Sequence, residues 1–532
     1  MPSNESSDPS KNRIMNGKQI VVIGAGPAGL TAAHELLAQS RGCHVVVLEE
    51  SHAFGGISRT VVHHGNRMDM GGHRFFTKVP EVNAWWDRML PRQGAPSFDD
   101  KTLGRACTLA GDGPDPETAD RVMLRRNRVS RIFFNRKFFD YPISLKPETF
   151  ANMGLWTTLV AGCSYLKAAL FKREEKSLED FYVNRFGKKL YSMFFERYTE
   201  NLWGRHPSQI DPSWGVQRVK GVSILAVVKN ALLKPFRKKD AAVETSLIEE
   251  FSYPKLGPGQ LWEVAADEVR RLGGDIRLGA KAVGFKRGEN GRISAVIYEQ
   301  DGERREEACD AIVSSMPVKD LVAGLPDVPD GISRIAVGLP YRDYMTVGVL
   351  VPTLLLKNKT KIKTLGGIVP DNWVYVHDRS VKMGRFQIYN NWSPYLVKDP
   401  EHTVWVGLEY FCNEGDALWS MDDAGFARLG VREMVSLGMI ASETDALDTH
   451  VERVKKAYPA YFDTYAEFPA LRAWLDTIPN LYCVGRNGQH RYNNIDHSMC
   501  TAFEAVRCIL SGSSDRSAVW NVNTEKEYHE GK

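Results

Sequence analysis

A glycine-rich turn near the N-terminus has the residue types and spacing that bind a dinucleotide. Residues 19–23 form an apolar, β-branched run, and Gly24, Gly26 and Gly29 follow before a helix-forming stretch. These glycines allow a tight turn, close approach of the backbone to a pyrophosphate, and packing of the helix on a sheet. Glu49 ends a second apolar run, where a carboxylate can bind a ribose 2′-hydroxyl. The chain is therefore predicted to hold a dinucleotide with its phosphates at a helix N-terminus.

The length and composition indicate a multidomain globular protein. At 532 residues the chain exceeds the roughly 250–300 residues at which single cores stop growing, so it can enclose a large cofactor. Hydrophobic residues make up 43% and charged residues 25%, as in soluble proteins. A net charge of +4 provides no basic field for nucleic acid. We expect a small-molecule ligand and no nucleic acid, and the composition leaves the oligomeric state open.

Cysteine and histidine spacing indicates neither disulfides nor a metal site. The eight cysteines are scattered without a CxxC pair, which is typical of reduced thiols and predicts a cytoplasmic location. The first seventeen residues lack the apolar core of a secretory signal. His63-His64 and the other histidines lack metal-ligand spacing, so no metal is predicted. Residues 154–171 are the most apolar segment, but polar residues interrupt it, which favours a buried or surface helix over a membrane span.

Changes in periodicity and composition divide the chain into seven segments. Three of them share α/β character and are predicted to form one nucleotide-binding domain. The segments are a disordered tail (1–17), the nucleotide-binding domain in three parts (18–95, 260–325 and 471–515), a mostly helical substrate-domain insertion (96–259), a substrate-binding sheet domain (326–470) and a C-terminal tail (516–532).

Local patterns refine this layout. Residues 97–120 are rich in Gly, Pro and Asp without periodicity, which predicts an irregular surface insertion. The basic stretch 229–239 is read as a solvated helix end or mobile loop in preference to a membrane-surface patch. Residues 340–412 have many aromatic residues and short turns, which predicts an antiparallel sheet forming a ligand wall.

This layout resembles flavoproteins of the glutathione-reductase-type FAD fold. The chain opens with a dinucleotide-binding βαβ unit, which other segments interrupt twice. Near its end a strand, Gly485-Arg486 and a helix complete the same domain. A second diglycine, Gly55-Gly56, resembles the extension found in amine oxidases, protoporphyrinogen oxidases and UDP-galactopyranose mutases. The resemblance implies an α/β fold, with an FAD-binding Rossmann domain and a mixed helical and antiparallel-sheet substrate domain. No second GxGxxG follows a strand, so NAD(P)H or another external reductant would bind only transiently.

Four further segments resemble UDP-galactopyranose mutases. They match the family's YTxxxWG, GGH, SNYSPY and GR…Y…NQDHS patterns at residues 198–204, 69–73, 390–395 and 485–498. Three features depart from the pattern: Ile495 stands where Gln is usual, the stretch from Arg486 to Asp496 is shorter than in eukaryotic mutases, and the 97–120 insertion is foreign.

The resemblance implies two activities. The first is isomerisation of a nucleotide sugar between pyranose and furanose through N5 of reduced flavin, with no net redox change. The alternative is an FAD-dependent oxidoreductase of the amine oxidase or protoporphyrinogen oxidase type, which oxidises a small molecule. A flavin-binding partner without catalysis is a third possibility, because one scaffold hosts many functions.

The resemblance also implies roles for individual residues. The implied catalytic residues are His73, Arg385 and Arg486, with guanidinium forks suited to a diphosphate. The implied substrate contacts are Trp203, Tyr395, Tyr492 and Asn494. The implied cofactor contacts are Gly24, Gly26, Ala28, Gly29, Glu49, Gly55, Gly56, Ser58, Arg59, Gly72, His73, Gly485, Asp496, His497 and Ser498.

Six of these side chains also have a purely structural reading. Arg385 fits an exposed strand arginine, and Arg486 fits a structural or flavin-contacting arginine. His73, Trp203 and Tyr492 fit packing residues. Asp496 fits the N-cap of the last helix, whose positive end would stabilise reduced flavin through backbone amides.

Overall fold

The computed structural model describes residues 13–141, 143, 147–212 and 250–522. Three separate stretches of this chain build one five-stranded sheet. Its strand order is β11-β4-β2-β15-β21, and every neighbouring pair is parallel. The strands are β2 (Gln19–Ile23), β4 (His44–Leu48), β11 (Asp275–Arg277), β15 (Ala311–Ser314) and β21 (Leu481–Cys483). Both faces of this sheet are covered, which explains the continuous β-branched runs in the sequence.

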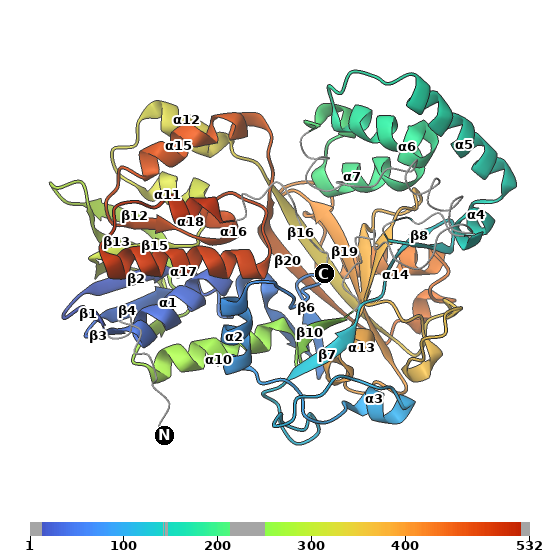
Figure 1. The fold of residues 1–532 in the computed structure, drawn as a ribbon, viewed down its shortest axis with the longest axis horizontal. Helices are drawn as coiled ribbons and strands as arrows, with labels where there is room; N and C mark the ends of the chain where they lie inside the picture. The colour runs from blue at the N-terminus through green and yellow to red at the C-terminus, as the bar shows by residue number, and fades with distance from the viewer. Residues whose placement is uncertain (1–12, 142, 144–146, 213–249, 523–532) are drawn as a thin grey trace, which may run out of the picture.

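Helices and a small sheet cover the two faces. One face packs on α1 (Pro27–Gln39), α2 (Pro80–Met89), α10 (Pro258–Arg271) and α17 (Ile495–Ser511). The other packs on β12 (Lys281–Arg287), β13 (Ile293–Gln300), α11 (Val318–Gly324), α12 (Asp330–Gly338) and α15 (Phe468–Leu475). The exposed strand β14 (Glu303–Ala308) pairs with β13 at the edge of the small sheet. Segments from the start, middle and end of the chain thus lie side by side in one lobe (Figure 1). The predicted α/β fold class is confirmed.

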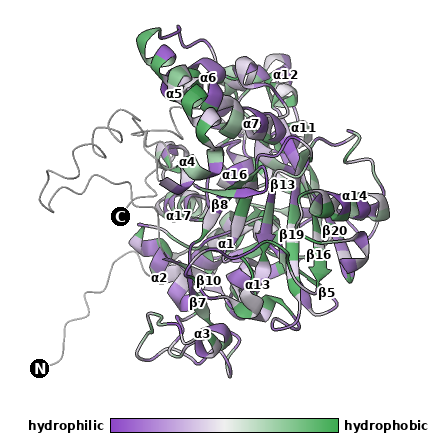
Figure 2. Ribbon diagram, turned by 90° about the vertical axis from the view of Figure 1, so that its right-hand side faces the viewer, coloured by the Kyte–Doolittle hydropathy of each residue, from purple (hydrophilic) through white to green (hydrophobic). Residues whose placement is uncertain are grey.

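A seven-stranded sheet forms the centre of the second lobe. Its order is β20-β16-β19-β18-β17-β8-β9, antiparallel except for the parallel pair β17–β8. The strands are β8 (Ser130–Phe134), β9 (Lys137–Asp140), β16 (Tyr341–Val351), β17 (Trp373–Val376), β18 (Arg385–Ile388), β19 (Val404–Cys412) and β20 (Asp448–Pro459). Helix α14 (Asp423–Ser436) packs outside β16 and β20 (Figure 2).

The segment 96–259 contains more sheet than the predicted helical insertion. Strands β8 and β9 join the large sheet, and β7 (Met123–Asn127) pairs with β10 (Glu250–Pro254). Residues 97–120, predicted to be irregular, include helix α3 (Phe98–Leu103), whose Asp99 is buried and ion-paired with buried Arg126 at 2.7 Å. These elements depend on partners distant in sequence, so local periodicity did not reveal them.

The helices of 96–259 form a separate layer. Among the described residues that follow α3, they are α4 (Pro147–Met153), α5 (Leu155–Leu170), α6 (Leu178–Phe194) and α7 (Glu196–Trp203), of which α5, α6 and α7 lie together at one end of the molecule in Figure 2. The described residues contain no helix long and apolar enough to cross a membrane.

Each segment predicted to be a tail contains a described element. Strand β1 (Arg13–Ile14) pairs with β3 (Ser40–Arg41), so order begins before residue 18. Helix α18 (Ser517–Asn521) buries Trp520 in the core. The rest of both tails and the basic stretch 229–239 lie outside the described residues.

Candidate active site

Two glycine turns meet at the start of α1. Gly24 has φ +96°, and a Cβ on Gly29 would lie 1.8 Å from the Gly24 carbonyl oxygen, so both positions require glycine. The Gly55 N–H donates to the Ala25 carbonyl at 2.9 Å. A Cβ on Gly56 would lie 3.5 Å from the Gly26 Cα, so the two backbones face each other. Since α1 begins after Gly26 without a side-chain cap, its first amides suit a pyrophosphate.

Polar side chains next to these turns are already partly paired. Buried Glu49 accepts from the Ala25 N–H at 2.7 Å and from the Ser51 N–H at 2.9 Å. Ser58 donates to the Gly55 carbonyl at 2.8 Å. Arg59 donates to Glu452 of β20 at 3.3 Å. Glu49 therefore lies at the end of β4, the position predicted to contact a ribose. Arg59 links the Gly55-Gly56 turn to the seven-stranded sheet.

A short hairpin leads from these turns to His73. Its strands are β5 (Thr60–His63) and β6 (Asn66–Asp69). Fully buried Asp69 accepts from Thr60 at 2.8 Å and from Tyr253, and no cation pairs with its carboxylate among the interactions of the described residues. Burial raises the pKa of Asp69 to about 7, although these hydrogen bonds oppose the shift. Asp69, whose carboxyl group titrates near neutral pH, is thus the last residue of β6 and lies two residues before Gly71.

His73 is held as a neutral imidazole. Its Nδ1 lies 2.9 Å from the Gly71 carbonyl oxygen, an acceptor, so Nδ1 carries the proton and Nε2 is left as an acceptor. Burial, together with the positive charges of Arg486 and Arg385, lowers the pKa of His73 to about 3. The structure thus brings together the three residues predicted to be catalytic, although their catalytic roles stay predictions.

Arg385 is buried in the sheet and is not the exposed strand arginine of the alternative reading. Its Nε donates to Glu409, a fully buried carboxylate, and its Nη2 donates to the Tyr458 hydroxyl at 2.9 Å. Its guanidinium carbon lies 4.6 Å from the centre of the Trp373 ring. The positive charge of Arg385 is therefore compensated within the protein by Glu409.

Arg486 is anchored by the backbone. Its guanidinium donates to the Asn493 carbonyl at 2.7 Å and to the Ala457 carbonyl at 3.2 Å. The guanidinium carbon lies 4.9 Å from the centre of the Tyr492 ring, which stacks on Tyr458 with centres 6.1 Å apart. Because its partners are uncharged carbonyls, Arg486 retains an uncompensated positive charge in these contacts.

The N-cap of the last helix lies two residues before the predicted Asp496. Its N-cap is Asn494, which forms a capping box with His497, so the reading of Asp496 as N-cap is wrong. Asp496 instead accepts from Thr77 at 2.8 Å, and Ser498 donates to the Asn493 side chain at 2.9 Å. The signal was present in the sequence, since Asn is as good an N-cap as Asp.

Several predicted site residues take positions apart from this group or at its edge. Trp203 is 3% exposed and packs edge-on to Phe462 in the core. Tyr395 donates to Glu117 and accepts from the Phe98 N–H at 3.1 Å, beside α3. Gly72 packs against Trp373 and Trp392, and Gly485 faces Ala28 across the first turn.

Some residues of the site escaped sequence analysis. Glu409 pairs with Arg385, and Gln387 donates to the same carboxylate at 2.6 Å. Tyr458 bridges both arginines. The one sequence signal was a charged residue inside the apolar run of β19, because such a residue is rarely buried without a partner.

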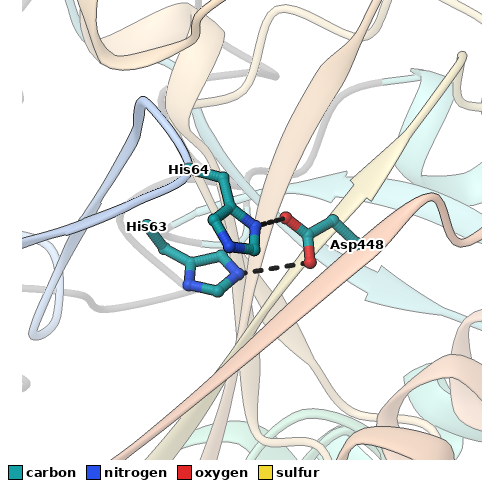
Figure 3. Close-up of side chains that lie close together, drawn as sticks. All are labelled: His63, His64 and Asp448. Atoms are coloured by element: carbon teal, nitrogen blue, oxygen red, sulfur yellow. Dashed lines mark hydrogen bonds and ion pairs between the residues drawn. The ribbon is translucent and has the colours of Figure 1, made fainter.

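A histidine cluster at the tip of the hairpin was also missed. His63 Nε2 and His64 Nδ1 lie 3.2 Å and 2.8 Å from the two carboxylate oxygens of Asp448 on β20 (Figure 3). His64 has φ +49°, which turns two consecutive imidazoles to one side. Among the described residues this group has the ligand types and proximity to hold a metal ion, but as it stands it fastens the hairpin to the sheet.

Comparison with known proteins places this site in a family. The sequence profile of flavin containing amine oxidoreductases matches residues 27–509. The chain belongs to this family. Membership implies FAD as cofactor, and the paired glycine turns, the uncapped α1 and Glu49 fit it.

Individual relatives are distant in sequence. Protoporphyrinogen oxidase 2 of Arabidopsis thaliana is 22% identical over 67% of this chain and 68% of its own, and that of Nicotiana tabacum is 22% identical over 68% and 70%. Reduced UDP-galactopyranose mutase superposes with a TM-score of 0.72 at 18% identity, covering 97% of this chain and 100% of its own. A putative protoporphyrinogen oxidase from Exiguobacterium sp. 255-15 gives 0.63 at 14% identity, covering 94% and 100%. These structures share the fold.

The glycine turn gives a first prediction. We expect Gly29→Ala to purify with little flavin, because its Cβ would collide with the Gly24 carbonyl 1.8 Å away and displace the start of α1. The ratio of flavin to protein absorbance measures this. Gly331→Ala, where no atom lies within 4 Å of the added Cβ, is the control. Full flavin content in Gly29→Ala would contradict the role of this turn.

Asp69 gives a second prediction. Its carboxyl ionises near pH 4 when unfolded and near pH 7 when folded, so native stability falls as the pH rises through this interval. Above about pH 7 the buried, ionised carboxylate lowers the free energy of unfolding by about 4 kcal/mol. Asp69→Asn removes the titration, so its free energy of unfolding relative to wild type should rise between pH 4 and pH 8. Urea unfolding at both pH values tests this, with exposed Asp301→Asn as control. Parallel pH profiles for wild type and Asp69→Asn would refute the assignment.

Proposed function

We propose that the protein is an FAD-dependent mutase that isomerises a nucleotide sugar between pyranose and furanose forms with the flavin reduced. The observation that carries the proposal is that Arg385 and Arg486 meet at Tyr458, through a hydrogen bond of 2.9 Å and a ring contact of 5.7 Å, with Arg486 directly after the Gly485 that faces Ala28 of the first glycine turn. Glu409 compensates the charge of Arg385, whereas Arg486 contacts only carbonyls and aromatic rings. The excess positive charge supports an anionic ligand such as a diphosphate.

Each side chain has a defined task in this proposal. Reduced flavin, when bound, supplies the nucleophile for the anomeric carbon. Arg486 binds the diphosphate through the N–H bonds that its backbone partners leave free and holds the leaving group close for its return. Neutral His73 accepts a hydrogen bond or a proton at Nε2 and adds no positive charge at pH 7. Tyr492 and Tyr458 form an aromatic surface next to the diphosphate.

An oxidoreductase of the amine oxidase or protoporphyrinogen oxidase type is the second candidate. Arg385 already pairs with the Glu409 carboxylate, which compensates its charge and weakens its attraction for a diphosphate. Trp373 and Tyr375 add a flat aromatic surface, with ring centres 5.5 Å apart, that suits an apolar substrate. The names of the two plant relatives agree with this candidate.

One experiment separates the two candidates. Dithionite-reduced protein is incubated with UDP-galactopyranose and other nucleotide sugars, and furanose products are separated by chromatography. The mutase proposal requires product from reduced protein and none from oxidised protein. Oxygen consumption by the oxidised protein with amines or porphyrinogens, without furanose formation by the reduced protein, would overturn it.

Arg486 provides a third prediction. Arg486→Lys loses the planar fork, so we expect the Kd for UDP on the reduced protein to rise by about tenfold to a hundredfold, as for loss of charged hydrogen bonds of about 1.5–3 kcal/mol. Titration calorimetry measures this.

A matched control separates ligand binding from anchoring. Arg491→Lys alters another arginine that donates to two backbone carbonyls, those of Trp520 and Val522. If both variants changed UDP affinity equally, Arg486 would have only a structural role.

A further inference from the structure

Helix α5 carries its large apolar side chains outward. Leu155 and Trp156 are each 78% exposed, Leu159 is 54%, Leu166 is 61% and Leu170 is 76%. Their spacing places them, with exposed Cys163, on one stripe about 100° wide. Phe171, 73% exposed, continues the stripe past the helix end. Contiguous exposure of this kind is rare on monomeric proteins and marks an interaction surface.

The opposite side of α5 is already used for packing. Ala161 and Ala168 are buried, and Ser164 accepts from the Lys189 N–H of α6 at 3.1 Å. A Cβ on Gly187 would lie 2.7 Å from the Tyr165 nitrogen, so the two backbones approach closely. Small residues hold α5 on α6, and the large residues play no part in that contact.

Basic residues outnumber acidic ones next to the stripe, and the exposed acids just beyond it are paired, Glu174 with Lys176 at 2.9 Å and Glu175 with Arg185 at 2.7 Å. Helix α5 contains no acidic residue, and its single charged residue is exposed Lys167. Exposed Lys172 and Arg173 follow directly. Arg173 lies 3.7 Å from Asp180, so the lysines supply most of the free positive charge. An apolar stripe with a tryptophan at one end and basic residues at the other suits the interface of an anionic bilayer.

The size of the surface favours a membrane over a protein partner. Sixteen residues make a helix about 24 Å long, and a helix with side chains is about 10 Å wide. Such a face offers a few hundred Å², well below the roughly 800 Å² per partner of a stable complex. At 16 residues, α5 is also shorter than the about 20 residues that a membrane-spanning helix needs. Figure 1 shows α5 at the outer edge of its lobe, where a flat surface can reach it.

We propose that this stripe (Leu155, Trp156, Leu159, Leu166, Leu170 and Phe171, the α5 face) docks the protein on the surface of a membrane rich in anionic phospholipid. The helix lies in the plane of the interface, with leucine side chains in the acyl boundary and Lys167 and Lys172 at the headgroups. This inference is independent of the proposed reaction.

Vesicle co-sedimentation of the flavin-loaded full chain tests the proposal. We expect binding to vesicles of phosphatidylcholine with phosphatidylglycerol, weaker binding to phosphatidylcholine alone, and weakening by salt. Leu159→Glu with Leu166→Glu should reduce the binding constant at least about tenfold without changing flavin content. The control is Val337→Glu with Leu355→Glu, two exposed apolar residues elsewhere, which should bind as wild type.

Three outcomes would overturn the proposal. The first is absence of binding to either kind of vesicle. The second is a concentration-dependent dimer, seen by sedimentation velocity, that the Leu159→Glu, Leu166→Glu variant abolishes, because the α5 face would then join two copies. The third is that the variant loses much of its thermal stability while the wild type binds no vesicles. In that case another part of the same chain would cover the α5 face.

Discussion

The backbone contact between the two glycine turns is the constraint on which the site depends. Ala25 accepts from the Gly55 N–H, and a Cβ on Gly55 would lie 2.7 Å from the Trp262 ring of α10. This contact places the start of α1 and the start of the β5–β6 hairpin next to each other. Since the chain continues from the end of the hairpin at Asp69 through Gly71 to His73, one contact positions both the start of α1 and the histidine. Substitutions at either turn therefore affect both.

Charge in the site is balanced by segments that are distant in sequence. Arg385 on β18 and Glu409 on β19 are neighbours in the sheet register, so sheet formation itself pairs them. Leaving one charge of such a pair without its partner costs about 3–5 kcal/mol, so the pair stabilises this register. Arg486 comes from the first lobe and is anchored by the carbonyls of Ala457 and Asn493. His73 stays neutral because both cations and burial act on it.

Local patterns in the sequence were enough to predict the first lobe, and long-range contacts explain what they missed. Strands such as residues 19–23 and 311–314 were evident in the sequence because both faces of their sheet are buried, which gives continuous apolar runs. Gly24 and Gly29 were evident because the backbone geometry requires glycine there. Glu409, Asp448 and the parallel pair β17–β8 could not be predicted, because their partners lie 24 to 385 residues away or depend on sheet order. The family resemblance identified Arg385 and Arg486, but no spacing revealed what they bind within the protein.

The anchoring of Arg486 also bears on how an anion is recognised. An arginine paired with a carboxylate offers a ligand little net charge, whereas one held by carbonyls keeps its full charge while its position is fixed. Arg385 is of the first kind and Arg486 of the second. In the proposed mutase, attraction of the diphosphate would therefore depend mainly on Arg486, and Arg385 would orient Tyr458. Because the Asn493 carbonyl that holds Arg486 directly precedes the N-cap of α17, the start of this helix and the Arg486 guanidinium are positioned by the same turn of chain.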